Sequence, residues 1–450
     1  MSTPYQMHIV PENTGLCKKI KQTDEAAQTA SKLLQQDLQN HHVFFNTSGF
    51  HNHIPHHLLA LYGTGASSSS LSNAYGTNTT YQRPVLSLHE SVVKDLVTSF
   101  SRAGPYLGKE KHYPDFLSFF QREMQRLGGW KPVVAEYLFK EGDEMADDML
   151  VRLFSGFLHP LIQLMYGMEW EQEAIVAEAL AQAAVHGNEI GGYLLGTEKL
   201  ARESGGGGGG GEGWGVVELL DMIGADEKIK VAVRNEDGNK IRDGVLVRAR
   251  DEMLRVAARV RMREDDVEER TVEMFDACVY MASAAAVHPV KVPKFDFFLM
   301  HHVNASPIFV TINAQDWIPL KTKARLLEWK IRMDLIEYAA RGVPPLSVEK
   351  IAGYKPGREK GTSPVEIVSQ LHDFPDDGHA IKLARAALIC RDISRLYEDR
   401  DWVKIKGDEL WLRIFNLIVD SVEAPGEHWV RTCGLEEAWK DIPDSQDAKL

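Results

Sequence analysis

Histidines are the residues of this sequence best suited to chemistry. The chain has 17 of them in 450 residues, and His51, His53, His56 and His57 lie within FHNHIPHHLLALYGTGA. On a helix that begins near His53, His56 and His57 share its face at spacings of three and four. Neutral imidazoles beside apolar residues need polar partners when they are buried. The cluster therefore predicts at least one metal ligand.

Three further apolar segments carry histidines. His159 lies in SGFLHPLIQLMYGMEW, where a buried imidazole must be hydrogen-bonded or bound to a metal. By itself, this segment slightly favours a hydrogen-bonded core histidine. His301 and His302 follow FDFFLM, and only one of two adjacent helical residues can face a given site. His379 begins the segment HAIKLARAALICRDI, with Lys382 one turn later on the same face.

Lys382 is unusual beside a metal ligand, because an ammonium group cannot coordinate a metal. Burial and nearby positive charge lower the pKa of a lysine, and its neutral amine can react with carbon dioxide. The resulting carbamate would be an anionic oxygen ligand suited to iron. The alternative is an ion pair between Lys382 and Asp376 or Asp377.

Compact metal motifs are missing from the sequence, which has neither HExxH nor CxxC. Its four cysteines, Cys17, Cys278, Cys390 and Cys433, are scattered, as expected for reduced thiols in an intracellular protein. Histidines on several separate apolar helices are typical of a metal centre inside a helical bundle. Imidazole binds Zn, Cu, Fe and Ni alike, so the residues alone predict a helical metalloprotein without naming its metal.

Helical periodicity dominates the elements that would position these residues. The predicted helices cover 24–39, 90–101, 113–127, 143–167, 171–186, 267–286, 317–340, 379–396 and 409–422. The best hairpin candidate is Lys228 to Arg234, which precedes Asp237-Gly238. We therefore expect an all-α fold, a large helical bundle-like domain over residues 1–450 with minor β decoration.

Composition disfavours some classes of partner and indicates where the protein is located in the cell. A net charge of −13 disfavours binding to nucleic acids or anionic membranes. We find no signal peptide and no apolar stretch of transmembrane length, so we expect a cytoplasmic protein. Residues 204–213 form a glycine-rich run that we interpret as a flexible insertion. Gly63-Thr64-Gly65 follows a helical pattern rather than a strand, which argues against a Rossmann nicotinamide site.

Four segments, in this order, resemble those of the questin oxidase-like family: FHNHIPHHLLALYGTGAS, HPLIQLMYGMEWEQEAIVAEALAQAAVH, FDFFLMHHVNAS and DDGHAIKLARA. The resemblance runs from about residue 40 to about residue 420. It implies oxidation of aromatic polyketides, particularly anthraquinones, in secondary metabolism. Members are described as Baeyer–Villiger-type oxidases or as ring-cleaving oxygenases, which implies oxygen insertion beside a quinone carbonyl and opening of the central ring.

The same resemblance implies a non-haem iron site held by histidines and a carbamylated lysine. The family motifs match Asn52-His53, His159 to Ile162, Met300-His301 and Gly378 to Lys382, which favours His53 over His56 and His57, and His301 over His302. The implied ligands are His53, His159, His301, His379 and Lys382. Gln163 departs from the pattern, because the resemblance implies a second histidine there in many relatives, which argues against Gln163 as a ligand.

We therefore expect an Fe(II)-dependent oxygenase whose partners are dioxygen and an aromatic polyketide. Four imidazoles and one carbamate would leave one octahedral position for dioxygen or a substrate oxygen. Tyr62, Met165, Tyr166, Trp170, Phe297 and Phe298 are candidate walls of the substrate cavity, with ordinary core packing as the alternative. One competing hypothesis is an NADPH-dependent Baeyer–Villiger-type oxidase whose metal, if present, is structural. The other is a non-catalytic helical binding protein.

Overall fold

The computed structural model describes residues 1–204, 213–357 and 361–445, and helices dominate this part of the chain. The described residues form isolated β-bridges but no sheet. The prediction of an all-α fold is therefore confirmed. The chain divides into two compact units, one of residues 1–191 and 371–385 and one of residues 192–370 and 386–450. That the chain is one domain stays a prediction, and most of the glycine-rich insertion, 205–212, lies outside the described residues.

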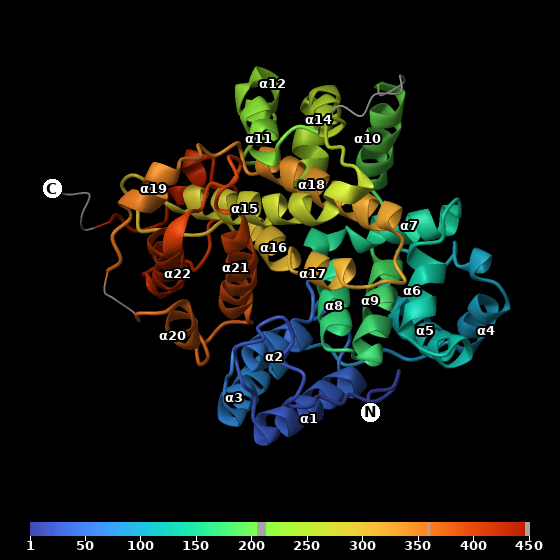
Figure 1. The fold of residues 1–450 in the computed structure, drawn as a ribbon. Helices are drawn as coiled ribbons and strands as arrows, with labels where there is room; N and C mark the ends of the chain where they lie inside the picture. The colour runs from blue at the N-terminus through green and yellow to red at the C-terminus, as the bar shows by residue number, and fades with distance from the viewer. Residues whose placement is uncertain (205–212, 358–360, 446–450) are drawn as a thin grey trace. The chain divides into compact units, whose positions relative to one another are not determined.

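The first unit is built around α9, whose residues Ala174 to Val185 are all buried. A helix that is apolar on every side must be surrounded, and α9 packs against α5, α7 and α8. The unit contains α1 (Asp24–Asn40), α2 (Ile54–Gly63), α3 (Ser68–Thr79), α4 (Glu90–Thr98), α5 (Tyr113–Leu127), α6 (Trp130–Leu138), α7 (Glu144–Leu153), α8 (His159–Glu169), α9 (Glu173–Val185) and the first turns of α21 (His379–Ser394) (Figure 1).

A break between α7 and α8 corrects the single helix predicted over 143–167. Gly156, Phe157 and Leu158 adopt positive φ angles of 56°, 54° and 65°, which an α-helix cannot contain. A Cβ atom on Gly156 would lie 2.4 Å from Cε1 of His186, so only glycine allows this close approach. The break places His159 at the first position of α8.

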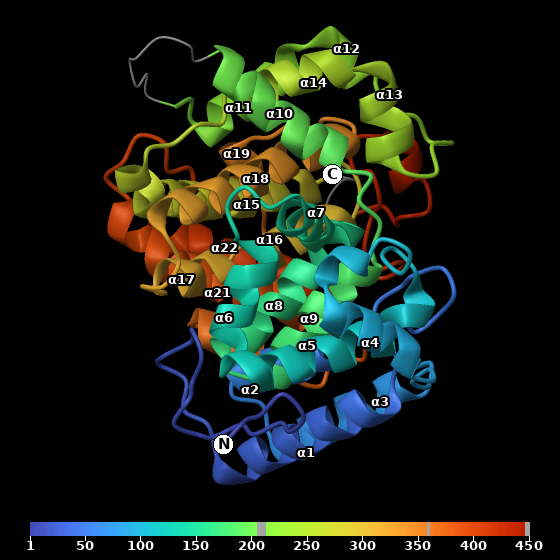
Figure 2. The ribbon, with the colours of Figure 1, turned by 90° about the vertical axis from the view of Figure 1, so that its right-hand side faces the viewer.

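The second unit is centred on α15 (Val267–Ala286) and α18 (Leu320–Ala340), which pack against each other and against α16 (Phe297–Ala305) (Figure 2). Its other helices are α10 (Gly191–Ser204), α11 (Val216–Ala225), α12 (Glu227–Lys230), α13 (Leu246–Arg248), α14 (Arg250–Ala257), α17 (Ile308–Asn313), α19 (Val348–Gly353), α20 (Pro364–Ser369), α22 (Gly407–Glu423) and the remainder of α21.

The predicted hairpin at Lys228 to Arg234 is wrong, because this segment begins with α12 and continues as a turn. Asp226 caps the helix, and its carboxylate accepts hydrogen bonds from the backbone N–H groups of Lys228 and Ile229 at 2.9 and 3.0 Å. The cap provides hydrogen-bond acceptors for the backbone N–H groups at the start of this helix, so the segment does not pair with a second strand.

Membrane-spanning character is weak in the described residues. None of their helices is, taken singly, long and apolar enough to cross a membrane. The bent pair Glu144–Leu153 and Gly156–Glu169, with an angle of 68°, qualifies only by length and composition. Every residue of α8 is buried, as in the core helix of a globular unit.

Candidate metal centre

Three of the predicted ligands begin helices of the first unit. His53 is the residue before α2, His159 is the first residue of α8, and His379 is the first residue of α21. Prolines in the first turns of α2 and α8 favour helix starts at these points. All three side chains are buried. Each imidazole therefore lies at the positive end of a helix, which favours its neutral form.

His53 and His159 face each other across 106 residues of sequence, with their Nε2 atoms 2.9 Å apart. Their other ring nitrogens are already engaged. Nδ1 of His53 lies 2.8 Å from a carboxylate oxygen of Asp377, and Nδ1 of His159 lies 2.7 Å from the carbonyl oxygen of Gly156. Both acceptors require a proton on Nδ1, so in the neutral rings the two Nε2 lone pairs point at each other. This arrangement requires a cation, either a proton or a metal ion.

The geometry of this pair fits a metal ion. Two nitrogen ligands that lie about 2.1 Å from one ion, at a right angle to each other, are about 3.0 Å apart. Burial, first of all, and the positive charge of Lys382 lower the pKa of His53 to about 3. A ring with so low a pKa stays neutral, as a metal ligand must be. The two imidazoles therefore match one edge of a coordination octahedron.

Asp377 links a third imidazole to this pair. Its second carboxylate oxygen accepts a short hydrogen bond from Nδ1 of His379, and the rings of His53 and His379 meet edge-on with centroids 4.6 Å apart. One carboxylate thus fixes the tautomers of two histidines and leaves both Nε2 atoms as lone-pair donors. His53, Asp377 and His379 bring potential ligand atoms within 4.8 Å of one another. The sequence suggested Asp377 only as an ion-pair partner of Lys382, and its role as a shared acceptor was missed.

Lys382 lies one turn after His379 and is buried, with 1% of its surface exposed. Burial lowers the pKa of Lys382 to about 8, although the negative charges of Asp377 and Asp376 oppose this effect. A substantial fraction of its amine is therefore neutral near physiological pH. This is the form that can react with carbon dioxide, while the carbamate itself stays a prediction.

The start of α21 explains how His379 and Lys382 are held. Asp376 caps the helix and accepts hydrogen bonds from the backbone N–H groups of Gly378 and Ala380, each at 2.8 Å. Gly378 has a φ of 91°, and a Cβ atom there would lie 2.5 Å from the His57 ring. Only glycine therefore permits α21 to begin so close to α2.

The remaining histidines of the 51–57 cluster have other partners. His56 donates from Nε2 to the side-chain oxygen of Gln163 at 2.5 Å, and Gln163 donates to Glu178 at 3.0 Å. Nδ1 of His57 lies 3.2 Å from the side-chain amide of Asn78. His56 and His57 thus have partners outside the pair of His53 and His159, and the choice of ligand from this cluster stays a prediction.

A second imidazole pair lies beside the first and was missed in the sequence. Nε2 of His51 is 2.8 Å from Nε2 of His186, and the His51 ring stacks on His159 with centroids 3.8 Å apart. His186 follows the C-terminus of α9, and in the sequence it indicated only the end of a helix. The stacked ring fixes the plane of His159 and so supports its orientation.

His301 and His302 lie in the second unit. Nδ1 of His301 is 2.5 Å from the carbonyl oxygen of Phe297, and its side chain is fully buried. His302 is held by Asp334, 2.6 Å from its Nδ1, and by Glu337, 3.6 Å from its Nε2. Burial lowers the pKa of His302, but the hydrogen bonds to these carboxylates raise it above its ordinary value. His302 thus serves a buried ion-pair network, and the ligand role of His301 stays a prediction.

The six residues predicted to line the substrate cavity lie in both units. In the first, Tyr62 and Trp170 meet edge-on at 5.3 Å, and Tyr166 stacks on His56 at 5.4 Å. These residues and Met165 are buried, and Arg385 lies over the rings of Tyr166 and Trp170 at 5.6 and 5.9 Å. Tyr166 is thus next to His56, a histidine of the 51–57 cluster. In the second unit, Phe297 and Phe298 carry Arg431 and Arg341 over their rings. A substrate contact by any of the six stays a prediction.

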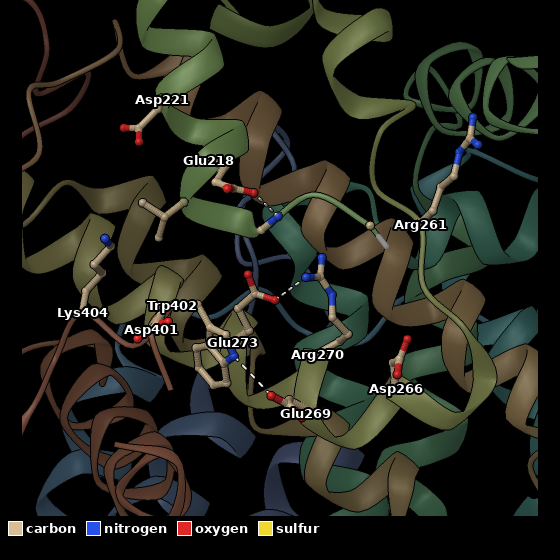
Figure 3. Close-up of a pocket in the computed structure, with 13 residues that line it drawn as sticks. Glu218, Asp221, Arg261, Asp266, Glu269, Arg270, Glu273, Asp401, Trp402 and Lys404 are labelled. Atoms are coloured by element: carbon tan, nitrogen blue, oxygen red, sulfur yellow. Dashed lines mark hydrogen bonds and ion pairs between the residues drawn. The ribbon is translucent and has the colours of Figure 1, made fainter. Parts of the chain in front are cut away.

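A pocket of about 550 Å³ lies in the second unit, between the start of α11, the start of α15 and residues 401–404 (Figure 3). Its lining is charged, and Figure 3 shows Glu273 paired with Arg270 and Trp402 donating to Glu269. Six acidic and three basic residues line it. A flat aromatic substrate needs an apolar cavity, so this pocket is unsuited to the predicted substrate.

An Asp377→Asn variant tests the shared carboxylate. An asparagine has one acceptor oxygen, so it can hold only one of the two Nδ1–H groups in place. We expect the affinity for ferrous iron to fall by about 10- to 100-fold, as for other partners of metal ligands. Asp373→Asn is the matched control, since Asp373 is an exposed aspartate of the same segment that has no part in the predicted site. Equal iron affinity in the two variants, measured by anaerobic titration, would remove Asp377 from this role.

Comparison with known proteins gives consistent matches. A family model described as questin oxidase-like matches residues 50–387. The chain is 34% identical to a Baeyer-Villiger oxidase of Pestalotiopsis fici, over 98% of this chain and 99% of that protein. It is 33% identical to the questin oxidase of Aspergillus fumigatus, over 98% and 100% of the two chains. An oxidoreductase of Aspergillus parasiticus is 34% identical, over 99% and 95%.

Proposed function

This chain belongs to the questin oxidase-like family and is an oxidoreductase, and we propose that it is a non-haem iron oxygenase. Its proposed reaction is the oxidative cleavage of one ring of an anthraquinone-like aromatic polyketide. The relatives support the reaction class, because two of them are named Baeyer-Villiger oxidase and questin oxidase. The observation that carries the iron is the pair of inward-facing Nε2 atoms of His53 and His159.

The proposed ligand set in the first unit is His53, His159, His379 and Lys382. When bound there, ferrous iron would supply a centre that binds and activates dioxygen, which reacts poorly with closed-shell aromatics on its own. Burial lowers the pKa of His53 and of His379, which suits this ion, because a neutral imidazole need not lose a proton to coordinate it. Asp377 and the carbonyl of Gly156 hold the rings in the coordinating tautomer.

The protein's own part in the reaction is exclusion of water and orientation. His53, His159, His379 and Lys382 are buried, and Tyr166 of α8 stacks on the neighbouring His56. A dry site prevents the loss of reactive oxygen species to solvent and strengthens every electrostatic contact. An aromatic substrate placed against such walls would present its carbonyl carbon in one orientation.

Oxygen and cofactor stoichiometry tests this proposal. Anaerobically purified protein is loaded with ferrous iron and given anthraquinones under labelled dioxygen, with and without NADPH. We expect ring-opened product without NADPH, in amounts that depend on bound iron and with both atoms of the labelled dioxygen in the product, because incorporation of both atoms needs no external reductant. Product that requires one NADPH for each turnover and is independent of iron would establish the NADPH-dependent Baeyer–Villiger reaction instead. Absence of both iron binding and turnover would favour a non-catalytic binding protein.

A further inference from the structure

Two histidines and an aspartate form a separate cluster in the first unit. His89 precedes α4, His112 precedes α5, and Asp115 lies in the first turn of α5. Nδ1 of His112 is 2.7 Å and Nδ1 of His89 is 3.1 Å from the same carboxylate oxygen of Asp115. The other carboxylate oxygen accepts the backbone N–H of His89 at 2.6 Å. Asp115 is fully buried, so its position is fixed by these three contacts.

The two hydrogen-bond distances to Asp115 are also close to the distances between neighbouring ligands of one metal ion. Ligands about 2.0–2.2 Å from an ion, at angles between 90° and the tetrahedral value, lie about 2.8–3.6 Å apart. The two N–O distances fall at or close to this range, and all three ligand atoms lie within 4.8 Å of one another.

We propose that His89, His112 and Asp115 form a second divalent metal site, distinct from the iron centre. Two imidazole nitrogens and one carboxylate oxygen favour zinc or a similar transition metal over magnesium or calcium. The side chain of His89 is 48% exposed, which leaves the site open to solvent and to a water ligand. Binding requires only that each neutral imidazole move its proton from Nδ1 to Nε2, so no net proton is lost.

The predicted role of this site is structural. Its ligands hold the starts of α4 and α5, two helices that pack along each other (Figure 2). An ion that binds the folded protein and not the unfolded chain stabilises the folded state by an amount that grows with the logarithm of the ion concentration above its dissociation constant. Zinc should therefore raise the melting temperature of the iron-loaded protein.

The test is a zinc titration of the iron-loaded full chain, with iron and zinc counted in the same samples. We expect a zinc equivalent above the iron content in the wild type. His89→Ala should weaken zinc binding at least tenfold and abolish the rise in melting temperature without changing the iron content. Because His89 is half-exposed, this variant should fold normally.

His41→Ala is the matched control. His41 also donates from Nδ1 to an aspartate, Asp37, at 2.8 Å, but this pair lacks a second histidine. The control should keep the zinc equivalent. The proposal is overturned if the wild type binds no zinc beyond its iron, if His89→Ala binds zinc as tightly, or if zinc enters only by displacing iron. None of these results would alter the evidence for the iron centre.

Discussion

A His159→Ala variant should retain less than about a tenth of the iron of the wild type and lose ring-cleaving activity by at least about 100-fold. The variant removes one of two Nε2 atoms that lie 2.9 Å apart, and with it an edge of the proposed coordination polyhedron. It also removes the ring on which His51 stacks. Elemental analysis of anaerobically reconstituted protein measures the iron, and oxygen uptake with an anthraquinone measures the activity.

The control for this variant is His8→Ala, which removes an exposed histidine of the same unit. It should retain full iron and activity. Circular dichroism of each variant shows whether the helices are intact, so that unfolding is not mistaken for the loss of a ligand. A folded His159→Ala protein with wild-type iron content would contradict the proposed centre. His301→Ala in the same series tests the predicted ligand from the second unit.

A Lys382→Gln variant should also lose most of its iron and at least about 100-fold in activity. Glutamine cannot form a carbamate, so the proposed anionic oxygen ligand is lost. In the wild type, carbon-13 NMR with labelled bicarbonate should show a carbamate signal. Because burial lowers the pKa of Lys382 to about 8, the amine is largely protonated at pH 6. Iron loading should therefore be slower at pH 6 than at pH 8.

Lys294→Gln provides a matched comparison. Burial lowers the pKa of Lys294 to about 8 as well, but its amine donates to the carbonyl oxygens of Ser421 and Ala424 at 2.7 and 2.8 Å. This variant should keep its iron and show no change in the carbamate signal. If Lys382→Gln keeps full iron and activity, the lysine is not a ligand, and the alternative of a charge interaction with Asp376 and Asp377 is favoured.

Local signals in the sequence determined most of the helices. The predicted helices over 24–39, 113–127 and 267–286 match α1, α5 and α15 to within a residue, because apolar spacing and capping act over a few residues. The same locality explains two errors. The helix over 143–167 breaks at 156–158, where positive φ angles bring the backbone of Gly156 against His186, a residue distant in sequence. The segment from Lys228 is helical because Asp226 caps it, and the alternation of apolar residues concealed this cap.

The sequence by itself also supplied the chemistry of the candidate site, namely the histidine-bearing segments and the lysine one turn after His379. Only the tertiary structure decided which nitrogens meet. His53 meets His159, whereas His56 and His57 meet Gln163 and Asn78. The tautomer of His53 depends on Asp377, 324 residues away. Helical hydrogen bonds form between residues four positions apart, so a sequence shows them directly. A pair of imidazoles brought together by packing leaves no periodic trace, because the positions of their backbones are set by the whole core of the unit.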